Sequence, residues 1–299
     1  MRKYKYFICD VFTTTRFGGN QLAVLPEANG LSKTEMQQIA HEFNYSESTF
    51  VFPANDAHDR AVRIFTPAIE VPFAGHPNIG TAFVLAKTGE FGDIGAGKTI
   101  RFDEKAGTVS VAIRHDGSNL IHCELTAPQG LTLGESVGAA RMAEALSLDE
   151  QDIATSAHFP QIAGVGLPFL VVELASRDAL QRAQANLTEF KRLLDEGIVP
   201  DVHVYVRCDD EFDIRARMFA PFDGVAEDAA TGSANCGLVA LLMHNDPNNT
   251  AEQTWRISQG VEIDRPSVLE ARAQRQGDHI QTWIGGNCVL VCEGTIEIE

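Results

Sequence analysis

The strongest constraint on the fold of this chain is an internal repeat. Three pairs of segments match in the same order, at offsets of 154, 157 and 155 residues. The pairs are VRIFTP (62–67) with ARMFAP (216–221), AGHPNIG (74–80) with TGSANCG (231–237), and TIRF (99–102) with TWRI (254–257). Self-similarity at half the chain length predicts two copies of one domain rather than an array of short repeats.

The length of the chain supports two domains. Its 299 residues exceed what one small core usually serves, and domains of about 150 residues are the ordinary expectation. We predict an N-terminal domain at residues 1–127 and a C-terminal domain at residues 128–299, with a last strand that crosses back to the first domain.

The composition excludes some classes of partner. The formal net charge is −17, and such an acidic surface repels a polyphosphate backbone, so nucleic acid is not an expected partner. A small anionic substrate stays compatible with this charge, because backbone N–H groups at a helix end can bind an anion locally. The longest apolar runs, such as residues 237–243, are too short to span a membrane, so no membrane partner is expected.

The N-terminus and the cysteines indicate the compartment. The first residues, MRKYKYFICDVF, lack the apolar core and cleavage site of a signal peptide. The six cysteines contain no C-x-x-C pair and are predicted to be free thiols in a reducing compartment, without a metal site. We therefore expect a cytoplasmic protein.

Local patterns in each half predict an α+β fold. Each half shows several strands and one long apolar helix, so the prediction is two pseudo-symmetric domains, each a strand-rich sheet around a central apolar helix. The expected helices begin after the Ser32–Glu35 capping box and end near Asn44, and cover 77–87, 178–195 and 233–244. The expected strands are 19–25, 48–52, 61–65, a pair around the turn at 115–119, then 169–174, 202–206, 213–219, 255–258, 267–272, 279–284 and 288–292.

The two apolar helices begin at similar loops. Gly75 and His76 lead into the first helix, and Gly232 and Ser233 follow Asp228 into the second. Glycine permits close approach, and the first N–H groups of a helix attract anions such as carboxylates. Taken singly, His76, Asp228 and Ser233 are each explained by ordinary helix capping. The duplicated context favours a shared ligand site.

A third segment, NYSESTF at residues 44–50, contains Glu47 between a helix end and an apolar strand. An exposed loop glutamate is the common case. If Glu47 instead lies in a cleft, desolvation raises its pKa and suits the carboxyl to proton transfer.

Five segments together resemble the PhzF-like isomerase family of phenazine biosynthesis, from about residue 6 to the C-terminus. They are GNQLAV, NYSESTFVF, RIFTPAIEVPFAGHPNIGTA, RMFAPFDGVAEDAATGSA and SQGVEIDRPS. The resemblance implies the diaminopimelate-epimerase-like fold, in which two similar domains each wrap a strand-rich barrel around a central helix, with the active site between them. It also implies a homodimer that uses no cofactor and no metal.

The resemblance assigns roles to individual residues. Glu47 resembles the acid/base that takes and returns a proton. His76 and Asp228 resemble groups that hold the substrate and assist the transfer.

The remaining pocket residues follow from the same resemblance. Ser233, with the N–H groups of Gly75 and Gly232, would bind polar groups of the substrate. Asn20 resembles a further pocket residue. The main departure from the family is Gln21, where its members often have proline.

The related epimerases and racemases use two cysteines, one in each pseudo-symmetric loop. Ala74 and Thr231 hold those two places in this chain, so a two-thiol mechanism is excluded and a single carboxylate is left to move the proton.

The leading hypothesis is a cofactor-independent isomerase acting on a small cyclic amino-carboxylate, such as trans-2,3-dihydro-3-hydroxyanthranilate. The alternatives are an epimerase or dehydratase acting on another amino acid, and a non-catalytic carboxylate-binding protein. A hydrolase built from Ser233, His76 and Asp228 is disfavoured, because TGSANCG is not a G-x-S-x-G elbow.

Overall fold

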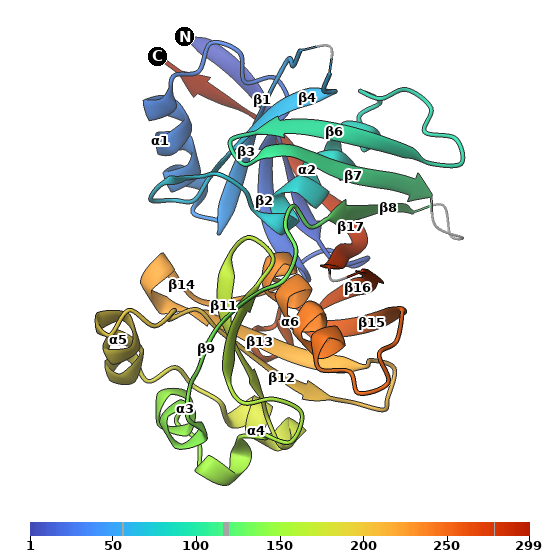
Figure 1. Cartoon of the computed structure of the whole chain (residues 1–299). Coiled ribbons are helices and arrows are strands. Elements are labelled where there is room, and N and C mark those ends of the chain that lie inside the picture. Colours follow the sequence, from blue (N-terminus) through green and yellow to red (C-terminus); the bar gives the residue numbers. More distant parts are fainter. Residues whose placement is uncertain (56, 116–119, 278) are drawn as a thin grey trace. The chain divides into compact units, whose positions relative to one another are not determined.

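The computed structural model describes residues 1–55, 57–115, 120–277 and 279–299 and divides the chain into two compact units (Figure 1). Unit 1 comprises Met1–Thr126 and Gly285–Glu299, and unit 2 comprises Ala127–Ile284. The chain therefore leaves unit 1 once and returns to it with its last segment.

The strands of unit 1 form a closed ring. In that ring β1 pairs with β2, β2 with β3, β3 with β4, β4 with β6, β6 with β7, β7 with β8, and β17 joins β8 to β1. Closure satisfies the backbone groups that an open sheet edge would expose. The strands are β1 (Arg2–Val11), β2 (Asn20–Leu25), β3 (Glu47–Phe52), β4 (Arg60–Phe65), β6 (Lys98–Glu104), β7 (Gly107–His115), β8 (Ile121–Thr126) and β17 (His279–Ile298), with the short β5 (Glu70–Val71) paired to β4.

The central helix of unit 1 is α2 (Gly75–Lys87), which contacts β1, β2, β3, β7 and β8 (Figure 1). Its residues from Gly75 to Leu85 are buried, as expected for a helix that is apolar on all sides. Gly80 permits the close packing, since a Cβ there would lie 2.5 Å from Leu22 Cδ2. The second helix, α1 (Lys33–Phe43), begins at the predicted Ser32–Glu35 capping box.

Unit 2 repeats this order of elements. Its β11–β12 and β13–β15 pairs are parallel, as are β2–β3 and β4–β6 in unit 1, and the other pairs match in direction. The strands are β9 (Thr132–Ser136), β10 (Gln161–Gly164), β11 (Pro168–Glu173), β12 (Val202–Arg207), β13 (Ile214–Ala220), β14 (Val225–Asp228), β15 (Glu252–Gln259) and β16 (Ser267–Gln276). The central helix is α6 (Gly232–His244), which packs on β10, β11 and β16. The predicted α+β fold, with one apolar helix inside each strand-rich half, is confirmed.

One predicted helix is wrong. The segment predicted as a single helix at 178–195 forms α4 (Arg177–Arg182) and α5 (Leu187–Asp195). The break has a tertiary cause, because the carbonyls of Leu180 and Ala183 accept hydrogen bonds from Arg217 Nη1 on β13. Asn186 then caps α5.

Other differences concern boundaries and short elements. The strands predicted at 279–284 and 288–292 are one strand, β17. The predicted turn at 115–119 falls mostly on residues 116–119, outside the described residues. The elements that were not predicted include β1, β5, β9, β10, β14, α3 (Ala139–Leu146) and the 3-10 helices at Glu150–Asp152, Pro221–Asp223 and Val261–Ile263.

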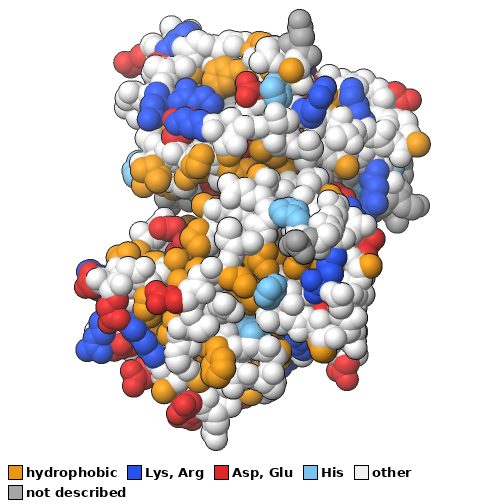
Figure 2. All heavy atoms as spheres, in the orientation of Figure 1, with side chains coloured by type: hydrophobic (Ala, Val, Ile, Leu, Met, Phe, Trp, Pro, Cys, Tyr) orange, Lys and Arg blue, Asp and Glu red, His pale blue; other side chains and the backbone are white. Residues whose placement is uncertain are grey.

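The surface agrees with the composition. Acidic and basic side chains are both spread over the face shown in Figure 2, so the negative net charge leaves locally basic areas. No helix in the described ranges combines the length and hydropathy that a membrane span requires.

Candidate functional site

The first turn of α2 carries the predicted histidine. His76 is the second residue of the helix, and the N-cap residue is Ala74, so an interpretation of His76 as the cap is wrong. In the described chain no side chain caps this helix. Gly75 is the first helical residue, so its N–H group belongs to the helix end that attracts anions.

Three elements of unit 1 bring a chain of polar side chains together at this helix end. Ser46 Oγ donates to Asn20 Oδ1 at 3.2 Å, and Asn20 Nδ2 lies 3.4 Å from His76 Nδ1. His76 Nε2 in turn lies 3.5 Å from Glu47 Oε2. Gly19 precedes β2 and has a φ of +65°, which favours glycine. A Cβ at this position would lie 2.3 Å from Val11 O, so no larger residue fits.

His76 is neutral at physiological pH. Burial lowers the pKa of its imidazole to about 3, opposed by a hydrogen bond with the backbone of Gln21. The contact with Glu47 is therefore one between a carboxyl and a neutral imidazole, and not an ion pair. Gln21, the position that departs from the family pattern, takes part through its backbone.

In unit 2 the loop before α6 places Asp228 beside Thr231. Asp228 is the last residue of β14, and Thr231 Oγ1 donates to Asp228 Oδ2 at 2.6 Å. Gly232 and Ser233 are the first two residues of α6, Thr231 is the N-cap residue, and within the described chain no side chain caps the helix. The capping interpretation of Asp228 and Ser233 is therefore wrong.

A buried ion pair fixes the strand that ends at Asp228. Arg217 donates from Nε and Nη2 to the two carboxylate oxygens of Glu227, at 2.9 and 2.7 Å. A bidentate pair of this kind sets orientation as well as attraction. Unit 1 has the same arrangement, since Arg63 Nε donates to Glu70 at 2.7 Å.

Sequence reasoning missed a polar cluster behind the second loop. Gln259 and Asn235 are fully buried, and Asn235 Nδ2 donates to Gln259 Oε1 at 2.8 Å and to Thr231 O at 3.0 Å. His203 Nε2 lies 3.2 Å from Asn235 Oδ1, and burial lowers the pKa of His203 to about 4. The asparagine has a counterpart in the first half of the repeat, and Gln259 lies in one of the motifs quoted above, so both signals were present in the sequence.

Unit 1 contains the corresponding pair. Asn78 Nδ2 donates to Ala74 O at 3.0 Å, and both carboxyl oxygens of Glu104 are buried without a hydrogen-bond partner among the described residues. Burial raises the pKa of Glu104 to about 8, so its carboxyl is largely protonated at neutral pH.

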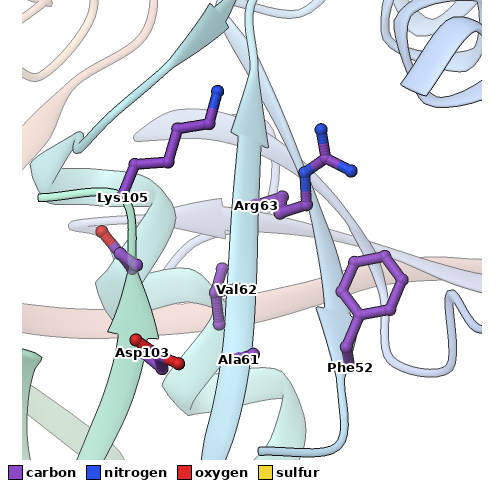
Figure 3. Close-up of a pocket in the computed structure, with 7 residues that line it drawn as sticks. Phe52, Ala61, Val62, Arg63, Asp103 and Lys105 are labelled. Carbon is purple, nitrogen blue, oxygen red and sulfur yellow. The ribbon is translucent and has the colours of Figure 1, made fainter. Parts of the chain in front are cut away.

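A surface hollow of about 460 Å³ lies elsewhere on unit 1 (Figure 3). Its lining residues are Phe52, Ala61, Val62, Arg63, Asp103, Glu104 and Lys105. None of the site residues predicted from the sequence lines it. In Figure 3 the Arg63 and Lys105 side chains extend the same way, and both pair with Glu70. Within the described residues, no group of three or more His, Cys, Asp or Glu side chains could hold a metal ion.

The structure thus brings Asn20, Glu47 and His76 together within unit 1. It places Asp228, Gly232 and Ser233 together within unit 2. A common cleft for the two sets stays a prediction.

Sequence comparisons cover nearly the whole chain. A sequence profile of the PhzC-PhzF family, described as phenazine biosynthesis-like protein, matches residues 9–294. The chain is 32% identical over 298 residues to the trans-2,3-dihydro-3-hydroxyanthranilate isomerase of Pseudomonas chlororaphis, covering 98% of this chain and 99% of that protein. It is 36% identical over 311 residues to an uncharacterized isomerase of Mesorhizobium japonicum, covering all of both chains.

Solved structures show the same fold. A Bacillus anthracis phenazine biosynthesis protein of the PhzF family matches with a TM-score of 0.90 at 23% identity, over 100% of both chains. A hydroxyproline epimerase from Agrobacterium vitis matches with a TM-score of 0.70 at 12% identity, over 99% of this chain and 91% of that one. The predicted epimerase-like fold is confirmed.

Proposed function

This chain belongs to the phenazine biosynthesis-like protein family of isomerases, and we propose that it moves a proton within a small cyclic amino-carboxylate by acid/base catalysis from one carboxyl group. Relatives that are named trans-2,3-dihydro-3-hydroxyanthranilate isomerase support this substrate class. Following the family resemblance, we take the residues of both domains to act in one active site.

The observation that carries the proposal is the placement of Glu47 against a neutral histidine. Ser46 donates to Asn20 Oδ1, which leaves Asn20 Nδ2 to face His76 Nδ1. Because burial lowers the pKa of His76 to about 3, its imidazole is a neutral neighbour of Glu47, whose Oε2 lies 3.5 Å from Nε2. A neutral partner of this kind orients a carboxylate without locking it in an ion pair.

The proposed reaction uses Glu47 twice. As a carboxylate it takes a proton from one ring carbon, and as the resulting acid it returns the proton to another carbon of the same ring. No bond to the enzyme forms, and the proton count of the substrate is unchanged. His76 and Asp228 hold the substrate during the transfer.

The helix ends supply the binding groups. The uncapped first turns of α2 and α6 present the N–H groups of Gly75 and Gly232. Such groups, together with the Ser233 hydroxyl, suit the carboxylate and polar substituents of the substrate. Asn20 lies beside them in unit 1.

The test replaces Glu47 by Gln and assays isomerisation of trans-2,3-dihydro-3-hydroxyanthranilate in deuterated water. Loss of turnover and of solvent deuterium incorporation is the expected result. Undiminished turnover in the variant would exclude Glu47 from proton transfer. If the enzyme does not isomerise this substrate but exchanges a proton of other amino acids for solvent deuterium, it is an epimerase.

The homodimer and the cytoplasmic location are further proposals. They rest on the family resemblance and on the free thiols expected from the sequence. Light scattering after size-exclusion chromatography tests the dimer, for which a mass twice that of the 32.5 kDa chain is expected.

A further inference from the structure

We propose that Gln259 is a positioning residue, whose side-chain amide sets the orientation of Asp228 and of the first turn of α6. The inference rests on the function proposed for Asp228. Gln259 is the last residue of β15 and is fully buried.

Every hydrogen-bonding group of this amide is used within the loop and the helix that follows. Nε2 donates to Asp228 O at 2.9 Å and to Thr231 Oγ1 at 3.1 Å. Oε1 accepts from Thr231 N at 3.2 Å and from Asn235 Nδ2 at 2.8 Å. A primary amide has two N–H donors and two lone pairs, so its capacity is filled.

These contacts fix the direction of the Thr231 hydroxyl. Because Gln259 Nε2 donates to Thr231 Oγ1, the hydroxyl proton is available for Asp228, and Oγ1 lies 2.6 Å from Asp228 Oδ2. One carboxylate oxygen of Asp228 is thereby held in place by the Thr231 hydroxyl. The amide acts through Thr231 and touches no reacting atom.

The duplicated half of the chain supports this inference. The parallel β13–β15 pair aligns Arg215 with Ser258, and the parallel β4–β6 pair aligns Ala61 with Asp103. Glu104 is therefore the positional counterpart of Gln259. Glu104 is likewise buried, and Asn78, the asparagine in the first turn of α2, acts on the pKa of its carboxyl.

The two counterparts also match in chemistry. A protonated carboxyl has one donor and one acceptor, as the amide edge of glutamine has, whereas a carboxylate has acceptors only. The sequence neighbours of Glu104, Asp103 and Lys105, are both charged. Together with Arg63 of β4 they line the hollow shown in Figure 3. Lys105 and Arg63 are paired with Glu70, and no ion pair of Glu104 is found among the described residues.

The decisive experiment compares Gln259→Glu and Gln259→Leu with the wild type across pH 6–9. An ionised carboxyl at this place would lack both N–H donors and would turn the Thr231 hydroxyl away from Asp228. We expect the ratio of kcat in Gln259→Glu to kcat in the wild type to fall by about tenfold per pH unit above the pKa of the new carboxyl. For Gln259→Leu we expect a pH-independent loss of kcat of about 100-fold, with a smaller change in KM, because misplaced catalytic groups cost rate rather than binding.

The matched control is Gln281→Glu. The Gln281 amide donates to the carbonyls of Ala127 and Thr282 in the same unit, and neither carbonyl belongs to the Asp228 loop. Its kcat ratio should be flat with pH. A kcat ratio for Gln259→Glu that stays near one at every pH would overturn the proposal. The proposal would also be overturned if the loss of kcat in Gln259→Leu were no larger than the loss of folded protein, measured by near-ultraviolet circular dichroism. If Gln259→Leu does not fold, the pH profile of Gln259→Glu decides.

A second readout separates this inference from the proposed function. Hydrogen exchange of the Thr231 amide needs no substrate, and we expect it to be at least about tenfold faster in Gln259→Glu at pH 8 than in the wild type. Gln281→Glu should match the wild type. Unchanged exchange in Gln259→Glu would contradict the positioning role, whereas a wild type without isomerase activity would contradict only the proposed function.

Discussion

The first turns of α2 and α6 share one framework and differ in their reactive groups. In each, the fourth helical residue is an asparagine whose side chain donates to the N-cap carbonyl, at 3.0 Å in both cases. Each helix begins at a glycine, Gly75 or Gly232, and neither N-cap side chain makes a capping bond in the described chain. The duplicated domain has thus kept two equivalent helix ends without a side-chain cap among the described residues.

The side chains around these helix ends have diverged. Ile64 pairs with Val71 in unit 1, whereas Met218, its repeat counterpart, pairs with Asp228 in unit 2. His76 likewise corresponds to Ser233. The comparison teaches that duplication supplied two equivalent helix ends, and that substitutions then gave unit 1 the neutral histidine and unit 2 the anchored carboxylate.

The largest loss of kcat is expected when Glu47 is replaced, and its counterpart in unit 2 provides the comparison. Ser48 pairs with Phe65 and Val202 with Phe219, so the preceding residues Glu47 and Asp201 occupy equivalent positions. We expect Glu47→Gln to lower kcat by about 10²- to 10⁴-fold, the usual contribution of a general acid/base.

The control for that variant is Asp201→Asn. Burial, with the charge of Asp223 second, raises the pKa of Asp201 to about 7, so this carboxyl is also unusual without having a proposed role in catalysis. Its replacement should leave kcat within about threefold of the wild type. Equal losses of kcat in both variants would show that the two units share the proton transfer. The assignment of proton transfer to Glu47 alone would then be wrong.

A smaller loss is expected for Asp228→Asn. The amide keeps an oxygen for the Thr231 hydroxyl but removes the negative charge, so we expect kcat/KM to fall by about 10- to 100-fold. Steady-state kinetics at fixed pH measures this. Asp223→Asn, in the exposed part of the same loop, is the control and should retain wild-type kinetics. An Asp228→Asn enzyme with wild-type kcat/KM would exclude Asp228 from the site.

The third prediction concerns stability and compares Glu104 with the glutamine of unit 2. The folded-state pKa of Glu104 is about 8 and its ordinary value is 4.5, so the folded protein binds the extra proton. The contribution to stability is fully present below pH 4.5 and is lost as the pH rises through about 8. Glu104→Gln should therefore match the wild type near pH 5 and exceed it by about 2 to 4 kcal/mol near pH 9.

Thermal unfolding at both pH values measures this difference, as a Tm gain of several degrees at pH 9 only. A gain of the same size at pH 5 and pH 9 would show that Glu104 is not protonated in the folded state. Gln259→Glu should show the opposite trend, losing Tm as the pH rises.

The sequence was informative where interactions are local. The Ser32–Glu35 capping box predicts the start of α1 because both partners lie within one turn. The break between α4 and α5 was not predictable in this way. It depends on Arg217, a residue of β13 whose guanidinium donates hydrogen bonds to backbone carbonyls at the C-terminal end of α4.

The same distinction holds for the candidate site. The repeat and the family resemblance pointed to His76 and Asp228, because each lies in a motif beside a helix start. Gln259 was missed as a site residue, because only the parallel pairing of β13 with β15 brings the end of β15 to the Asp228 loop. Sequence spacing carries no information about that contact.

The smallest effect is expected for the two buried histidines, one in each unit. Burial lowers the pKa of His76 to about 3 and that of His203 to about 4. In both cases the unfolded chain binds a proton below about pH 6.5, so their contribution to stability is lost as the pH falls from 6.5 toward these values. Nitrogen-15 chemical shifts of both imidazoles should stay constant between pH 5 and 9, and should titrate near 6.5 in denaturant. A titration of His76 alone within this range would place a positive charge beside Glu47, and His76 would then be its ion-pair partner rather than a neutral one.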